Sequence, residues 1–123
     1  MAITIISFGY LHGPTPAADF AQDLRSFRDP HVDPAMRQLT GRDQAVITKV
    51  LGTPGVPAVI NTLALACAAR SGYGDRPVTA AVGCAGGRHR SVVVINTVAR
   101  LLREQGYDVT VQHRDLARPV VTR

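Results

Sequence analysis

The chain has 123 residues, of which 46% are apolar and 5% aromatic, and it contains no tryptophan. This length favours one domain over two, and the composition predicts a core built mostly from Val, Ile, Leu and Ala. The formal net charge is +5, and it is uneven: residues 1–45 hold four arginines against five aspartates, whereas residues 46–123 hold ten basic against four acidic residues. An arginine-rich C-terminal part favours an anionic partner such as a phosphate, although a solvated basic surface would give the same composition.

Several classes of protein are disfavoured at this stage. The two cysteines, Cys67 and Cys84, have no paired spacing, which indicates a reducing, cytoplasmic setting. The first residues lack the basic leader of a signal peptide, and the longest apolar run, residues 63–69, is far shorter than the roughly 20 residues that span a bilayer. The four histidines and two cysteines show no metal-ligand spacing, so neither a metal nor a cofactor is expected.

The predicted elements alternate between strands and helices along the chain. Apolar, β-branched runs predict strands, the second of them weak, and longer Ala- or Leu-rich patterns bounded by glycine or proline predict helices. Thr40 or Asp43 is expected to cap the first helix. The elements are a strand over 2–10, a strand over 20–24, a helix over 44–51, a helix over 58–70, a strand over 78–82, a helix over 91–105 and a strand over 109–113.

Residues 78–113 form a predicted strand–helix–strand unit of the size that favours a parallel crossover. A hairpin around "GCAGGRHR" is also conceivable, because "SVVVI" is β-branched. The length of the apolar pattern after Ser91 favours the helix. We therefore expect a single three-layer α/β domain with a mainly parallel sheet of about four strands flanked by helices.

The segment "GCAGGRHRS", residues 83–91, joins the third strand to the last helix. Ligands of open α/β sheets bind at this position, and free N–H groups at a helix start favour an anion. Gly86 and Gly87 carry no Cβ and let the backbone wrap an oxyanion, while Arg88, His89 and Arg90 can add side-chain donors. Ser91 can cap the helix or bind an oxygen. The alternative is a tight turn that uses glycines for geometry alone.

Cys84 and Arg90 also match the C-x5-R-S/T pattern of cysteine-dependent phosphatases, which this segment resembles. In such an enzyme Cys84 would be the nucleophile and Arg90 the phosphoryl clamp. Gly83 stands where those enzymes usually have histidine. No convincing acid loop is present, although Asp23 and Asp29 are candidates. Phosphatase activity is therefore the alternative to a binding function.

A polar cluster follows the weak second strand: Asp23, Arg25, Asp29 and His31. These side chains either face the same pocket, with Arg25 on phosphate and His31 on a sugar hydroxyl or acting as an acid, or form a surface loop held by Asp–Arg pairing. His113 is expected to end the last strand near the glycine-rich loop, followed by a turn.

The same loop resembles the "GCTGGxHRS" signature of the C-terminal domain of the RapZ family of RNase adapter proteins. The resemblance covers nearly the whole chain, through "SFGY" (7–10), "ADFAQDLRSFRDPH" (18–31), "LTGRD" (39–43), "VLGTPGV" (50–56) and "HRDL" (113–116). Ala85 replaces the usual Thr of the signature. The nucleotide-binding domain of RapZ proteins carries a Walker-type loop, which this sequence lacks, so ATPase activity is not expected.

The resemblance implies a stand-alone regulatory domain that senses an amino-sugar phosphate, such as glucosamine-6-phosphate, and binds structured RNA as a homo-oligomer, presenting it to a partner protein. The matching ligand positions are Cys84, Gly86, Gly87, His89, Arg90 and Ser91, with Asp23, Arg25 and His31 as neighbours. RNA contacts would fall on Arg114, Arg118 and Arg123. The end of the chain lacks aromatic residues for base stacking, which weakens the RNA prediction.

Overall fold

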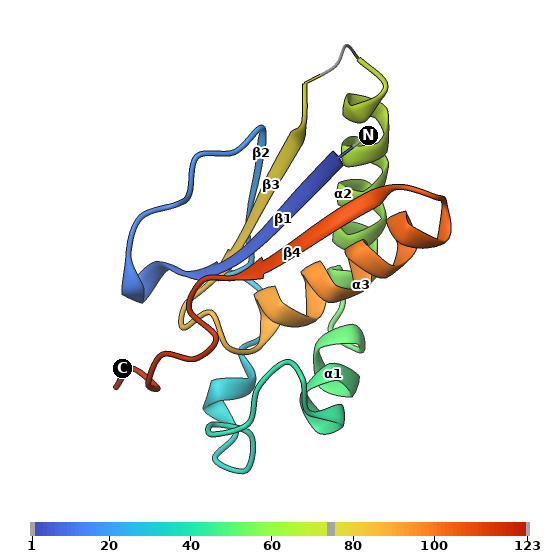
Figure 1. The fold of residues 1–123 in the computed structure, drawn as a ribbon. Coiled ribbons are helices and arrows are strands. Elements are labelled where there is room, and N and C mark those ends of the chain that lie inside the picture. The colour runs from blue at the N-terminus through green and yellow to red at the C-terminus, as the bar shows by residue number, and fades with distance from the viewer. Residues whose placement is uncertain (1, 74–75, 123) are drawn as a thin grey trace.

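A computed structural model describes residues 2–73 and 76–122. These residues fold into four strands and three α-helices, with short 3-10 helices at Tyr10–His12 and Pro30–Val32 (Figure 1). In chain order the main elements are β1 (Ala2–Gly9), β2 (Phe20–Asp23), α1 (Gln44–Leu51), α2 (Val56–Ser71), β3 (Val78–Cys84), α3 (Arg90–Glu104) and β4 (Asp108–His113).

The four strands form one sheet in the order β2-β3-β1-β4, and every pair is parallel. The central strand β1 pairs Ile5 with Ala80 of β3 on one side and with Val111 of β4 on the other. At the edge, Asp23 of β2 pairs with Gly83 of β3. Because all strands run the same way, their carboxyl ends meet at one edge of the sheet.

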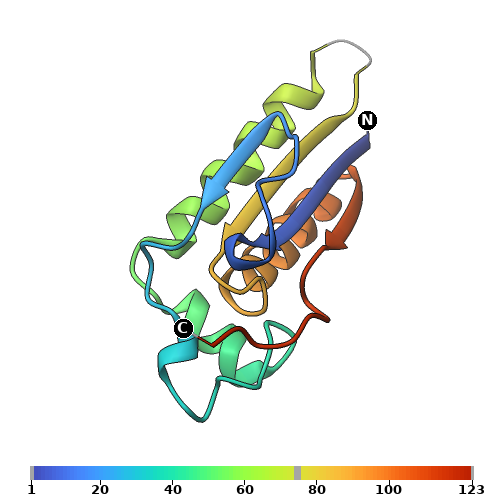
Figure 2. The ribbon, with the colours of Figure 1, turned by 90° about the vertical axis from the view of Figure 1, so that its left-hand side faces the viewer.

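The helices cover one face of this sheet. Ile3 and Ile5 of β1, which alternate with half-buried neighbours, belong to one apolar core with residues of α2 and α3. Helix α2 packs on α3, and α1 packs on both. In Figure 2 the helices α2 and α3 lie behind the sheet, and the segment that joins β1 to β2 passes in front of it. The expected three layers are therefore wrong. One face holds the α-helices, and no described α-helix covers the other.

The sequence placed the main elements correctly. The structure confirms the α/β class, the parallel crossover from β3 through α3 to β4, and the helix over 44–51. The hairpin alternative is excluded. Helix α2 starts two residues before the prediction, with Pro57 in its first turn and Gly55 before it at a φ of +90°. Neither 3-10 helix was anticipated, because three residues carry too little periodicity to detect.

Of the helices described, none is by itself long and apolar enough to cross a membrane. Helices α1 and α2 reach that length and composition only as a pair, and the pair is bent by 88°.

Candidate functional site

The carboxyl edge of the sheet gathers the ends of all four strands: Gly9, Asp23, Cys84 and His113. The glycine-rich loop, residues 85–89, leaves this edge and leads into α3, which starts at Arg90. This is the position at which open parallel sheets bind their ligands.

Gly87 of this loop and Gly9 of β1 are needed for the packing of the loop against β1. A Cβ on Gly9 would lie 2.4 Å from the carbonyl carbon of Gly86, and a Cβ on Gly87 would lie 2.7 Å from the Gly9 nitrogen. Gly87 also has a φ of +73°, which residues with a Cβ rarely adopt. The turn geometry therefore accounts for Gly9 and Gly87 without a ligand. This geometry does not exclude a ligand on the side of the loop that faces away from β1.

Gly83 has an equally local reason for lacking a side chain. A Cβ at this position would lie 2.4 Å from the ring of Phe8 and 2.7 Å from the ring of Tyr10. These two rings meet edge to face with centroids 4.8 Å apart. A histidine before Cys84, as in cysteine-dependent phosphatases, could not be accommodated here.

The backbone N–H groups at the start of α3 have no acceptor. Among the hydrogen bonds of residues 2–73 and 76–122, none has the N–H of residues 85–92 as its donor, whereas the carbonyls of Ala85 and Arg88 accept bonds from Leu11 and Gly41. No side chain caps the helix. Unpaired amides and the positive end of a 15-residue helix are together a favourable environment for an anion.

Arg90 is turned into the protein and does not face this loop. Its side chain is 3% exposed, and Nη1 donates to the carbonyls of Leu24 at 3.0 Å and Phe27 at 2.8 Å. Its Nη2 forms an ion pair with Asp29 Oδ2 at 2.9 Å. Arg90 therefore fastens the segment after β2 to the start of α3. Its Nη groups are engaged in these contacts.

Arg88 and His89 are likewise engaged with main-chain carbonyls. The Arg88 guanidinium donates to Arg118 O at 3.1 Å and Gln38 O at 3.1 Å. His89 is 3% exposed, and its Nε2 lies 3.0 Å from Met36 O and 2.7 Å from Leu39 O. Burial lowers the pKa of His89 below 6.5, and it outweighs the opposing effect of these two carbonyls. The neutral imidazole, with Nε2–H as donor, fits these contacts.

Cys84 lies beside Ser91 in the interior. The sulfur is 3.2 Å from Ser91 Oγ, and the two residues are 2% and 0% exposed. A phosphatase nucleophile must be reached by its substrate and needs a free arginine beside it. The burial of Cys84 and the contacts of Arg90 favour a structural role for both residues.

Asp23 and Arg25 pair with each other on the surface. Arg25 donates through Nη2 to Asp23 Oδ2 at 2.7 Å and through Nε to Oδ1 at 3.0 Å, and its guanidinium carbon lies 3.7 Å from the centre of the Tyr10 ring. The side-chain hydrogen bond from Arg25 is the main reason why the pKa of Asp23 lies below its ordinary value. This is the Asp–Arg pairing that the sequence left open as one of two readings.

His31 lines a hollow to which no residue of the glycine-rich loop contributes. The hollow has a volume of about 610 Å³ and is formed by the segment around the second 3-10 helix and the C-terminal segment. Its lining residues are His31, Val32, Arg37, Gln38, Val120, Val121 and Thr122. The structure therefore does not bring His31 together with Gly86 and Gly87 in one pocket.

A buried carboxylate at this edge was missed by sequence reasoning. Asp115 is fully buried, and its Oδ2 accepts from Gly9 N at 2.8 Å and from Arg114 Nε at 3.0 Å, while Oδ1 lies 3.1 Å from Arg118 Nε. Burial alone would raise the pKa of Asp115, but the bonds from Arg114 and Gly9 outweigh it, and the pKa lies below 3.8. "HRDL" held no signal that its aspartate would reach β1.

Two of the three predicted RNA-binding arginines, Arg114 and Arg118, have partners within the domain. Arg114 also donates to Pro14 O, and Arg118 pairs with the same carboxylate of Asp115. Arg123 lies outside the described residues.

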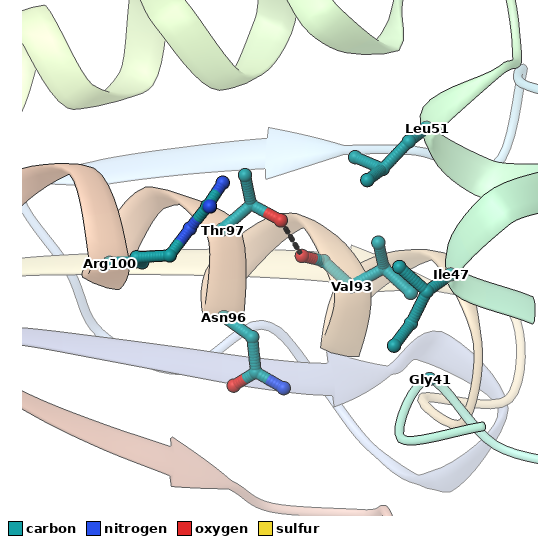
Figure 3. A pocket seen from close by; sticks show the side chains of 7 residues that line it. All are labelled: Gly41, Ile47, Leu51, Val93, Asn96, Thr97 and Arg100. Atoms are coloured by element: carbon teal, nitrogen blue, oxygen red, sulfur yellow. Dashed lines mark hydrogen bonds between the residues drawn. The ribbon is translucent and has the colours of Figure 1, made fainter. Parts of the chain in front are cut away.

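Two further hollows lie elsewhere in the described part of the chain, and no residue of the loop lines either of them. One, of about 280 Å³, lies between α1 and α3 (Figure 3), where Ile47, Leu51 and Val93 form an apolar side. Asn96 points away from Thr97 and Arg100 in this view. The other, of about 290 Å³, lies at the end of β4. Within the described part of the chain, no three His, Cys, Asp or Glu residues are placed to hold a metal ion.

Taken together, the fold and this edge define a small parallel α/β domain in which a glycine-rich loop opens the helix after β3. Residues 1–117 match the family model of the RapZ C-terminal domain, and the chain belongs to that family. It is 43% identical over 122 residues, 96% of its length, to a "nucleotide-binding protein" of Salinispora tropica, of which it covers 40%. A protein of the same description from Laribacter hongkongensis is 41% identical over 122 residues, with 96% of this chain and 44% of that protein covered. The chain thus spans about two fifths of the length of these curated relatives.

Proposed function

We propose that this domain is a regulatory module that binds the phosphate group of a small molecule, an amino-sugar phosphate such as glucosamine-6-phosphate, at the start of α3. The observation that carries the proposal is the row of backbone N–H groups at residues 85–92 without acceptors, at the carboxyl edge of a parallel sheet. A hydrogen bond to a charged group contributes about 1.5–3 kcal/mol, so two or three amides suffice for a specific site.

The cationic side chains of the loop have an indirect part in this proposal. Arg88 and Arg90 hold the segments on either side of the loop through main-chain carbonyls, and so fix the direction of its amides. The more exposed Arg25, stacked on Tyr10, is the cation best able to turn toward a bound phosphate.

A melting experiment tests the proposal. Ligand at about 100 times its dissociation constant stabilises the folded state by about 2.7 kcal/mol, which shifts the midpoint by several degrees for a domain of this size. We expect this shift with glucosamine-6-phosphate and none with glucosamine. Because the relatives are described as nucleotide-binding, a nucleoside monophosphate is the second probe.

A pair of variants at Ala85 provides the control. Ala85 is half-buried in the loop, and its N–H is one of the unpaired amides. Ala85→Glu places a negative charge beside these amides and should abolish the shift, whereas the similarly shaped Ala85→Gln should retain most of it. Equal shifts in both variants, or none with any phosphate in the unmodified chain, would overturn the proposal.

Phosphatase activity remains the alternative, with Cys84 as nucleophile, Arg90 as clamp and Asp23 as acid. It requires turnover of an aryl phosphate that Cys84→Ser abolishes. The burial of Cys84 leads us to expect no turnover by the unmodified chain.

Binding of structured RNA, as an oligomer that presents it to a partner protein, also stays a prediction. It requires an affinity that falls log-linearly with salt. Since Arg114 and Arg118 already pair with Asp115, we expect substitutions there to weaken the fold as well as any RNA contact.

A further inference from the structure

The hollow at the end of β4 differs chemically from the loop at the start of α3. It has a volume of about 290 Å³, and two basic side chains line it. Among the described residues, none that is acidic lines it. The lining residues are Thr40, Arg42, His113, Leu116 and Ala117.

His113 is held there by one hydrogen bond on each ring nitrogen. Nδ1 lies 2.7 Å from the buried Ser7 Oγ, and Nε2 lies 3.1 Å from Asn96 Oδ1. In the neutral ring Nε2–H donates to Asn96 and the Ser7 hydroxyl donates to Nδ1. On protonation the hydroxyl can reverse its role and accept from Nδ1–H. The imidazolium therefore keeps both hydrogen bonds.

The charge around His113 is one-sided. Burial and then the charge of Arg42 lower the pKa of His113 below 6.5. Among the described residues, no hydrogen bond or ion pair engages the exposed Arg42 guanidinium. Two carboxylates lie close in the sequence to the lining residues. Asp43 accepts from Thr40 N at 2.7 Å and forms no ion pair with Arg42, and Asp115 accepts from Gly9 and Arg114. Ser7 and Asn96, the partners on β1 and α3, are neutral.

We propose that this hollow is a second binding site, for a small oxyanion held between Arg42 and His113. The chemistry fits the negatively charged oxygens of a phosphate, sulfate or carboxylate group. The Arg42 guanidinium lines the hollow and can donate to two oxygens, and the protonated His113 ring, whose N–H groups stay on Ser7 and Asn96, adds a second positive charge. The site is separate from the loop, since no residue of 83–91 lines it.

Binding at this site is coupled to the protonation of His113. An anion beside the ring favours the imidazolium, and by reciprocity the imidazolium favours the anion. The site would therefore bind more tightly under acidic conditions, whereas backbone amides at the loop carry no titrating group.

The test is an NMR titration of the His113 ring against pH, at matched ionic strength, with chloride, sulfate or trifluoroacetate. The last two stay ionised throughout. We expect sulfate, trifluoroacetate or both to raise the pKa of His113 above its value in chloride. If only sulfate raises the pKa of His113, the site prefers tetrahedral oxyanions. If only trifluoroacetate raises it, the site prefers carboxylates. The same pKa in all three salts would overturn the proposal.

Three variants test whether the anion response of His113 arises in this hollow. Arg42→Gln should raise the pKa of His113 in chloride, because a repelling charge is lost, and should remove the further rise with anions. Arg28→Gln removes an exposed arginine outside the hollow and should leave the anion response unchanged. Ala85→Glu, which blocks the loop, should also preserve it. If Arg42→Gln keeps the full anion response, the site is not where we place it.

Discussion

Individual residues in and beside the glycine-rich loop have a packing role that does not depend on a ligand. Gly9 and Gly87 are 78 positions apart in the sequence, yet the backbone at each excludes a Cβ at the other. A reader of the sequence could predict that Gly87 needs a special conformation. The contact with Gly9 could not be predicted, because it depends on how β1 and β3 align.

This contact predicts a difference between two glycine substitutions. Gly87→Ala meets both an unfavourable φ and a nitrogen 2.7 Å away, whereas Gly106→Ala meets a φ of +92° with nothing within 4 Å. The φ alone costs roughly 1–2 kcal/mol, so Gly87→Ala should lower the free energy of unfolding by clearly more than Gly106→Ala. Urea denaturation measures both, and equal losses would contradict the packing described for the loop.

At the scale of elements, the start of α3 is the point at which distant segments are joined. Arg88, His89 and Arg90 looked like ligand donors because polar side chains follow the glycines. The structure directs them to carbonyls of residues 24–39 and of the C-terminal segment. A buried guanidinium needs partners, and irregular segments without regular ladders supply unpaired carbonyls. The sequence shows the donors, but not these acceptors.

Because Arg90 joins the segment after β2 to the start of α3, its substitution should strongly destabilise the folded protein. Arg90→Gln leaves Asp29 and several carbonyls without their donor, and breaking a buried ion pair costs about 3–5 kcal/mol. Denaturation should show a loss of that order, together with faster amide exchange over residues 24–29. The matched control, Arg28→Gln at an exposed position, should stay within about 0.5 kcal/mol. Similar losses in both would mean that Arg90 does not fasten this segment.

At the scale of the whole molecule, the sheet order β2-β3-β1-β4 decides what meets at the carboxyl edge. Apolar, β-branched runs and one long helical pattern were enough to predict the strands, their parallel direction and the α/β class. The single helical layer was not predictable, since the sequence does not say on which face a crossover lies. Asp115 was missed for a related reason. Only the pairing of β4 with β1 brings it to Gly9.

Asp115 therefore joins the ends of two strands, and its charge state should affect the stability of the whole domain. Its pKa in the folded protein lies below the ordinary 3.8, so the ionised carboxylate contributes stability that is present above pH 3.8 and is lost as the pH falls through the folded value. Asp115→Asn should cost about 2 kcal/mol or more near neutral pH. The difference in free energy of unfolding between the unmodified protein and Asp115→Asn should become smaller as the pH falls. A difference that is independent of pH would contradict this role.

The central claim is that the amides of residues 85–92 receive the phosphate of a small molecule. Backbone amide NMR during titration with glucosamine-6-phosphate tests it most directly. We predict that saturable shifts concentrate on the N–H signals of residues 85–92, with only weak changes when glucosamine is added. Shifts that leave these amides untouched, or that glucosamine reproduces, would contradict the claim.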